Sequence, residues 1–321
     1  MDSGLKNELE AKVLAGERLT YDDGVALYET DDLAWLGSLA HHVRTEKNGN
    51  RVVFNVNRHL NLTNVCAASC AYCSFQRKPG EQDAYTMRIE EAVSLAKEME
   101  GEQLTELHIV NGLHPTLPWR YYPRSLSELK KALPGVSLKA FTATEIQWFE
   151  KISGLSADEI LDELIDAGLD SLTGGGAEIF DPEIRDQIVD HNCHWEDWSR
   201  IHRLAHSKGL KTPCTMLYGH IEEPRHRVDH VKCFWVMHGL TTAQLSLNFG
   251  VDDLDGSVVE YKITHDADNF GTPNTMHRED LLELIRDAGF RPVERNTRYE
   301  TVREFDGPEP GRRDQPTTVW A

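Results

Sequence analysis

The sequence lacks the features that mark membrane and secreted proteins. It contains no run of about 18 apolar residues, so we expect no transmembrane helix. The opening residues, MDSGLKNELEAKVLAGERLT, are polar and amphipathic and do not resemble a signal peptide. Low-complexity tracts and long internal repeats are also absent from the sequence. These absences favour a cytoplasmic protein.

Basic residues are scarce relative to acidic ones. The 321 residues include 53 Asp and Glu but only 34 Lys and Arg, which gives a formal net charge of −19 at pH 7. No cluster of Lys and Arg is long enough to form the basic face of a nucleic-acid-binding protein. We therefore expect neither nucleic acid nor a membrane as a partner. Since 40% of the residues are hydrophobic, the chain can form a full core.

Strand and helix patterns alternate after a helical start. Residues 1–50 predict a helical extension, and residues 51–321 predict a barrel domain with a C-terminal helical region. The predicted strands are RVVFNVNRHLNLTN, ELHIVNGLHP, SLKAFTATEI, DSLTGGGAEIF and KTPCTMLYGHI. This order predicts an α/β protein with a parallel sheet that closes toward a TIM-like (β/α)8-type barrel. The functional residues of such barrels lie at the carboxyl ends of the strands.

Only six cysteines are present, and three of them lie in the short stretch NVCAASCAYCSFQRKPG. Cys66, Cys70 and Cys73 have the spacing C-x3-C-x2-C. A structural zinc site normally has four ligands, and no fourth cysteine is close in the sequence. Three thiolates in one loop suit a [4Fe–4S] cluster in which one iron has no protein ligand. A zinc site and incidental buried thiols stay open as alternatives.

The spacing, with Tyr72 before the last cysteine and a strand before the loop, is identified as that of the radical S-adenosylmethionine (SAM) superfamily. Longer stretches resemble the aminofutalosine synthase family of that superfamily. They are FNVNRHLNLTNVCAASCAYCSFQRKPGEQDAYTMRIEEA, ELHIVNGLHPTLPWRYYPRSL, KAFTATEI, GLDSLTGGGAEIFDPEIR and TMLYGHIEEPRHRVDH. The stretches FWVMHG, DDLDGSVVEYKITHDA and REDLLELIRDAGFRPVERNTRYE extend the resemblance over nearly the whole chain.

The resemblance implies a reaction and its cofactors. One [4Fe–4S] cluster with an open iron would bind S-adenosylmethionine, which is consumed as a cosubstrate. Its 5′-deoxyadenosyl radical would add to the vinyl carbon of 3-[(1-carboxyvinyl)oxy]benzoate. Aryl migration and loss of the carboxylate would then give 6-amino-6-deoxyfutalosine, in the futalosine route to menaquinone. A flavodoxin or ferredoxin is the implied electron donor.

The resemblance also implies roles for individual residues. The implied cluster ligands are Cys66, Cys70 and Cys73. The implied contacts to S-adenosylmethionine are Asn111, Gly112, Gly175, Glu178 and Tyr218. The implied catalytic residues are Glu145, His220 and Arg58. Glu178 follows three glycines, which let a backbone approach a ligand closely, although a plain turn is the alternative there.

The substrate in this reaction carries two carboxylates, so Arg or His partners are expected. The candidates are Arg58, His59, His114 and His220, with Arg77 and Lys78 as further cations near the rim. A structural or exposed role is the alternative for each histidine.

One crossover of the predicted barrel is too short. Between the strands TMLYG and KCFWVMHG only residues 220–231 remain, whereas a parallel crossover needs a dozen or more residues and usually a helix. Relative to the family pattern, we expect that the rest of a helix, a further strand and a further helix are missing between Val231 and Lys232. The expected barrel is therefore incomplete, and its closure around the benzoate would be impaired.

Three alternatives to this function stay open. A sister radical SAM enzyme, either a dehypoxanthine futalosine cyclase or an FO synthase subunit, would share the cysteine loop. The stretches NGLHP and KAFTATEI favour the aminofutalosine synthases over these sisters. A shortened, non-catalytic cluster-binding remnant is the second alternative, and a zinc-binding structural protein is the third.

Overall fold

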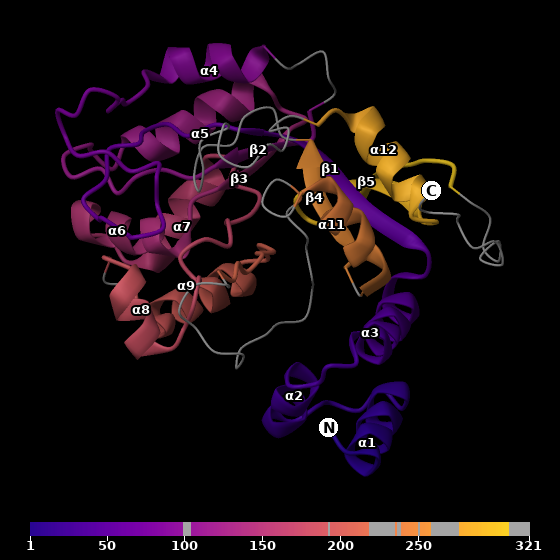
Figure 1. Cartoon of the computed structure of the whole chain (residues 1–321). Coiled ribbons are helices and arrows are strands. Elements are labelled where there is room, and N and C mark those ends of the chain that lie inside the picture. Colours follow the sequence, from indigo (N-terminus) through magenta and orange to yellow (C-terminus); the bar gives the residue numbers. More distant parts are fainter. Residues whose placement is uncertain are drawn as a thin grey trace.

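The fold is built around a curved sheet, most of it parallel, with helices packed on its outer face (Figure 1). The computed structural model describes residues 1–98, 104–191, 193–217, 235, 239–249, 251–257 and 276–307. Within this part of the chain, no helix is both long and apolar enough to cross a membrane.

Three helices precede the sheet: α1 (Ser3–Leu14), α2 (Tyr21–Tyr28) and α3 (Leu33–Asn48). Each begins at a side chain that accepts a hydrogen bond from a backbone amide of the first turn. The capping residues are Asp2, Thr20 and Asp32. These helices lie in the residues predicted to be helical. The division of the chain at residue 50 into two domains stays a prediction.

The central strand is β1 (Arg51–His59), which pairs in parallel on both sides. Its parallel partners are β2 (Glu106–Ile109), β4 (Asp253–Ser257) and β5 (Arg291–Arg295). Farther out, β3 (Ser137–Ala140) pairs in parallel with β2, and β6 (Thr301–Glu304) runs antiparallel to β5. Single parallel bridges from Lys139 to Ser171 and from Ser171 to Lys211 continue the sheet beyond β3. The predicted α/β barrel is confirmed as a curled half-barrel.

Helices connect the successive parallel segments, as the alternating pattern predicts. They are α4 (Ile89–Lys97), α5 (Tyr121–Ala132), α6 (Ala143–Ser153), α7 (Ala157–Asp166), α8 (Pro182–Ile188) and α9 (Trp195–Ser207). The C-terminal part contains α11 (Leu240–Ser246), the 3-10 helix η2 (Leu247–Phe249) and α12 (Arg278–Asp287). Figure 1 shows α4 to α9 on one side of β1, and α12 on the other.

The prediction of a strand over SLKAFTATEI is wrong in its second half. The strand β3 ends at Ala140, and Thr142 begins helix α6. The reason is a capping box: the Thr142 hydroxyl accepts from the Glu145 amide, and the Glu145 carboxylate accepts from the Thr142 amide. Among the described residues, the predicted strands DSLTGGGAEIF and KTPCTMLYGHI contribute single bridges, at Ser171 and at Lys211. The short crossover at 220–231 lies outside the described residues.

The outer face of the sheet carries two separate hydrophobic cores. The first core takes all its members from residues 60–210 and centres on aromatic rings. In it, the ring centroids of Tyr122 and Phe149 are 4.3 Å apart and those of Phe141 and Phe149 are 5.1 Å apart. The second core joins Val52, Phe54 and Val56 of β1 to residues between 235 and 293. Burying each large apolar side chain contributes roughly 1.5–3 kcal/mol.

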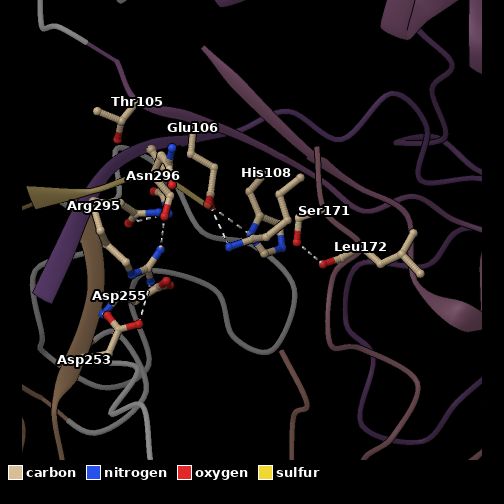
Figure 2. Close-up of polar contacts among 12 residues, drawn as sticks. Thr105, Glu106, His108, Ser171, Leu172, Asp253, Asp255, Arg295 and Asn296 are labelled. Atoms are coloured by element: carbon tan, nitrogen blue, oxygen red, sulfur yellow. Dashed lines mark hydrogen bonds and ion pairs between the residues drawn. The ribbon is translucent and has the colours of Figure 1, made fainter. Parts of the chain in front are cut away.

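The inner face of the sheet carries buried charges instead of apolar side chains (Figure 2). Side chains alternate along strands, so Glu106 and Lys139 lie opposite the apolar residues that face the helices. They form an ion pair of 2.6 Å, and both are buried. Asp253 and Arg295 form a second buried pair of 2.6 Å. The Tyr299 hydroxyl donates to the same Asp253 oxygen at 2.7 Å.

The variant Arg295→Met removes the guanidinium from the buried Asp253 carboxylate. Loss of one partner of a buried ion pair typically costs about 3–5 kcal/mol, and we expect the free energy of unfolding in urea to fall by that amount. Arg298→Met is the matched control, because the 2.9 Å pair of Arg298 with Asp170 is half-exposed and contributes below about 1 kcal/mol. Equal losses in the two variants would contradict the prediction.

Candidate functional site

The three predicted cluster cysteines lie in one loop, residues 64–80, which follows the carboxyl end of β1; we refer to it as the cysteine loop. Cys66 is buried, and Cys70 and Cys73 are half-buried. Burial raises the pKa of the Cys70 thiol, and negative charge on Cys73 and Cys66 raises it further. The thiols therefore lie close enough to repel one another as thiolates, and they need a positively charged partner to ionise together.

Backbone amides donate hydrogen bonds to the three sulfurs. The donors are Leu113 to Cys66 (3.3 Å), Asp190 to Cys70 (3.4 Å), and Gln76 and Phe75 to Cys73. Amide donors of this kind stabilise thiolate ligands and adjust the electronic properties of iron–sulfur clusters. The donor set therefore fits a [4Fe–4S] cluster held by three cysteines.

A single metal ion is the alternative to a cluster at the three cysteines. Among the described residues, no group of three or more His, Cys, Asp and Glu side chains converges on one point as metal ligands do. A tetrahedral zinc ion needs such convergence, whereas each cysteine of a cluster binds its own iron. The zinc alternative for the three cysteines stays open.

Side chains of the cysteine loop hold its own backbone. The Lys78 ammonium donates to the carbonyl oxygens of Cys66, Ala67 and Ala68 at 3.4, 3.2 and 2.9 Å. The Arg77 guanidinium donates to the carbonyls of Ser74 and Gln76 at 2.7 and 2.9 Å. The structure thus uses both of these predicted rim cations to bind loop carbonyls.

Asn111 and Glu145, two predicted site residues, contact each other behind the cysteine loop. The Oε1 atom of Glu145 accepts from the Asn111 backbone amide at 3.0 Å and from its side-chain Nδ2 at 3.1 Å. The Asn111 Oδ1 atom accepts from the Leu62 amide at 2.6 Å. These bonds join the end of β2 to the end of β1 and to the start of α6. Burial raises the pKa of Glu145 to about 7.

Gly112 lies where the segment after β2 touches the cysteine loop. Its amide donates to the Thr63 carbonyl at 2.9 Å, and a Cβ atom built on it would lie 2.4 Å from the Val65 carbonyl oxygen. Farther along, the Ala67 amide donates to the Leu113 carbonyl at 2.8 Å. Only glycine permits this close approach of two backbones.

The glycines before Glu178 are explained by packing against the protein itself. A Cβ atom on Gly175 would lie 2.9 Å from the Thr142 methyl group, and one on Gly176 would lie 2.3 Å from the Thr144 hydroxyl. Glu178 has a φ of 40°, and its Oε1 atom accepts from the Gly176 amide at 3.0 Å. Burial raises the pKa of Glu178.

Sequence reasoning missed Arg185, which is 2% exposed in helix α8. Its guanidinium donates to four carbonyl oxygens, those of Gly176, Ala177, Ile179 and Cys193. No sequence motif marks this role, because the acceptors are backbone atoms on both sides of the helix.

The other predicted residues are Arg58, His59 and His114, which the structure describes, and Tyr218 and His220. Arg58 is directed to Glu98, with 3.9 Å between Nη2 and Oε2. The His59 ring stacks on His108 with a centroid distance of 4.6 Å, and burial lowers the pKa of His59 to about 3. His114 is half-buried, and its Nδ1 accepts from two backbone amides, at 3.0 and 3.2 Å. Tyr218 and His220 lie outside the described residues.

Comparisons with known proteins agree with this fold and site. Residues 60–234, more than half of the chain, match the radical SAM superfamily, and residues 225–307 match the CofH/MqnC C-terminal region. The half-barrel with its three-cysteine loop is therefore that of a radical SAM protein. The crystal structure of methylornithine synthase shares the fold, with a TM-score of 0.65 at 16% identity over 89% of this chain and 97% of that one.

Two curated relatives narrow this class to a family. An aminodeoxyfutalosine synthase of Streptomyces coelicolor is 67% identical, with 98% of this chain and 99% of the relative covered. The aminodeoxyfutalosine synthase of Thermus thermophilus is 35% identical, with 92% of this chain and 95% of the relative covered. The chain belongs to the aminodeoxyfutalosine synthase family.

The same alignments reveal an internal difference in length. The alignment with the Streptomyces relative has 382 positions against 321 residues in this chain, so at least 61 positions have no counterpart here. Because nearly all of both chains is covered, the difference is internal. It agrees with the segment predicted to be missing, although the predicted place between Val231 and Lys232 lies outside the described residues.

The variant Gly112→Ala places a methyl group against the Val65 carbonyl and forces the cysteine loop to move. Overpacking of this kind costs about 1–3 kcal/mol, and we expect the variant to lose most of the iron bound after anaerobic reconstitution. Gly135→Ala is the control, because nothing lies within 4 Å of its added Cβ. Iron per chain and urea unfolding are the measurements. Equal iron in both variants would count against the packing argument.

The raised pKa of Glu145 predicts a dependence of stability on pH. Its stabilising contribution is fully present below the unfolded pKa near 4.5 and is lost as the pH rises through about 7. Glu145→Gln should therefore flatten the fall in unfolding free energy between about pH 5 and pH 8. Glu159 makes an exposed capping box with a lowered pKa, so Glu159→Gln should leave that fall unchanged. An unaltered profile in Glu145→Gln would refute the assignment.

Proposed function

We propose that the chain adds the 5′-deoxyadenosyl group of S-adenosylmethionine to 3-[(1-carboxyvinyl)oxy]benzoate. Aryl migration and loss of the carboxylate then give 6-amino-6-deoxyfutalosine, an intermediate of menaquinone biosynthesis. The observation that carries the proposal is the 67% identity to an aminodeoxyfutalosine synthase across almost the whole of both chains. The cysteine loop at the carboxyl end of β1 supports it, because the reaction needs a cluster at this end of the barrel.

In this proposal Cys66, Cys70 and Cys73 hold one [4Fe–4S] cluster, and its open iron binds S-adenosylmethionine. When bound, these groups supply the 5′-deoxyadenosyl radical. The amides of Asn111 and Gly112 are already bonded to Glu145 and Thr63, at 3.0 and 2.9 Å. The two residues therefore offer carbonyl oxygens to the methionine ammonium, which is itself a donor.

Gly175, Glu178 and Tyr218 contact the adenosine and methionine parts of the cosubstrate in this proposal. In this proposal the buried carboxylate of Glu178 accepts a hydrogen bond from a ribose hydroxyl. Such a donor stabilises the charged form of a carboxylate that is removed from water. Glu145 acts through Asn111, which it holds at the end of β2.

The substrate carboxylates are bound by cationic or histidine side chains at the rim. Of the candidates Arg58, His59, His114 and His220, the placement of His114 suits this task well. It is half-buried and directly follows the segment that touches the cysteine loop. A flavodoxin or ferredoxin supplies the electron, and the reaction takes place in the cytoplasm.

The internal difference in length supports a second candidate function. A barrel that lacks a segment of its wall would still hold the cluster and cleave S-adenosylmethionine, but it would not shelter the benzoate. The chain would then be a shortened cluster-binding remnant without transferase activity.

An anaerobic assay decides between these functions. The chain is reconstituted with iron and sulfide and then incubated with S-adenosylmethionine and a reductant, with and without the benzoate. We expect a product that retains adenine and has the mass of 6-amino-6-deoxyfutalosine, formed only with the benzoate. The triple variant Cys66→Ala, Cys70→Ala, Cys73→Ala should bind no cluster and form no product.

Other outcomes each identify an alternative. Cleavage to 5′-deoxyadenosine and methionine without an adenine-containing transfer product would support the remnant. Turnover of dehypoxanthine futalosine in place of the benzoate would identify a sister enzyme. Zinc without iron or sulfide in anaerobically purified protein would overturn the whole proposal.

A further inference from the structure

The segments on the two sides of helix α8 are held together by one buried side chain, that of Arg185. The Nη1 atom of Arg185 donates to the carbonyls of Ala177 and Ile179 at 2.8 and 2.9 Å. Its Nη2 atom donates to the carbonyls of Gly176 and Cys193 at 2.7 and 2.6 Å. One guanidinium thus joins residues 176–179, which precede α8, to Cys193, which follows it.

The end of α8 contacts the cysteine loop directly. The contacts are from Ala71 N to Ile188 O (2.9 Å), from Ser69 N to Asp190 Oδ2 (2.8 Å) and from Asp190 N to Cys70 Sγ (3.4 Å). The carbonyl of Arg185 also accepts from the Val189 amide at 2.9 Å. The position of Asp190 therefore depends on the hydrogen bonds by which Arg185 joins the segments before and after α8.

We propose that Arg185 is a positioning residue of the cysteine loop, which holds Asp190 so that its amide donates to the sulfur of Cys70. This inference rests on the proposed function only in assigning Cys70 to a cluster. A hydrogen bond to a cluster sulfur stabilises the reduced, more negative cluster and raises its reduction potential. Loss of the arginine should therefore lower that potential although every ligand is retained.

Geometry, and not charge alone, makes arginine suitable here. A guanidinium presents its donors in a rigid planar fork, whereas a lysine has one nitrogen at the end of a flexible stem. The four acceptors lie on two sides of α8, so a single ammonium cannot replace all four bonds. Arg185→Lys keeps the positive charge and removes the fork, which separates the two contributions.

Arg44 provides a matched control. It is also buried, at 3% exposed, and its guanidinium donates to the carbonyls of Gly49, Arg51 and Val251. These acceptors belong to the part of the molecule around α3 and β1, away from the cysteine loop. Arg44→Lys therefore loses the same kind of interaction without affecting Asp190.

The first test measures the midpoint potential of the reconstituted cluster by a redox titration followed by electron paramagnetic resonance. We expect a shift to more negative potential in Arg185→Lys, a smaller shift of the same sign in Asp190→Ala, and no shift in Arg44→Lys. The proposal is overturned if Arg185→Lys keeps the parent potential, or if Arg44→Lys shifts equally.

The second test needs no cluster. In the protein without iron, alkylation of Cys70 is followed by mass spectrometry and compared with alkylation of Cys66. We expect several-fold faster alkylation of Cys70 in Arg185→Lys and an unchanged rate in Arg44→Lys; equal rates would overturn the positioning role. If the parent chain binds no iron, the proposed function fails, and the alkylation rates still decide the role of Arg185.

Discussion

The cysteine loop must satisfy its backbone polar groups without a helix or a strand of its own. A buried amide or carbonyl without a partner costs free energy comparable to a lost hydrogen bond, so partners come from within the loop and from neighbouring segments. Lys78 of the loop itself supplies one set, the segment after β2 a second, and Asp190 a third. The position of the thiols therefore depends on the loop's own contacts and on two other parts of the chain.

The inner face of the half-barrel follows a different rule. Two buried cations of this face form ion pairs with buried carboxylates: Lys139 pairs with Glu106, and Arg295 pairs with Asp253. Such pairs contribute little net stability because desolvation offsets their attraction, but breaking one is costly. The charges of these two pairs therefore balance within the chain.

The fold class and the cysteine loop could be predicted from the sequence because their signals are local. Helical periodicity marked most of the helices, and the spacing of Cys66, Cys70 and Cys73 marked the loop. Helix α6 was missed although Thr142 and Glu145 form a recognisable capping box, because the apolar residues before it continue a strand pattern. The role of Arg185 could not be found in this way. Its acceptors are backbone carbonyls, which no side-chain pattern records.

The two hydrophobic cores determine what an internal loss of sequence can affect. Every member of the first core lies within residues 60–210, and this core supports β2, β3 and helix α6, which carries Glu145. The second core unites β1 with residues after 234, which follow the place where the missing segment is predicted. Apolar burial acts through direct contact, so β1 is one route by which damage to the second core reaches the first half of the sheet, and the ion pair of Arg298 with Asp170 is another. The first core itself is built entirely from residues that precede the predicted missing segment.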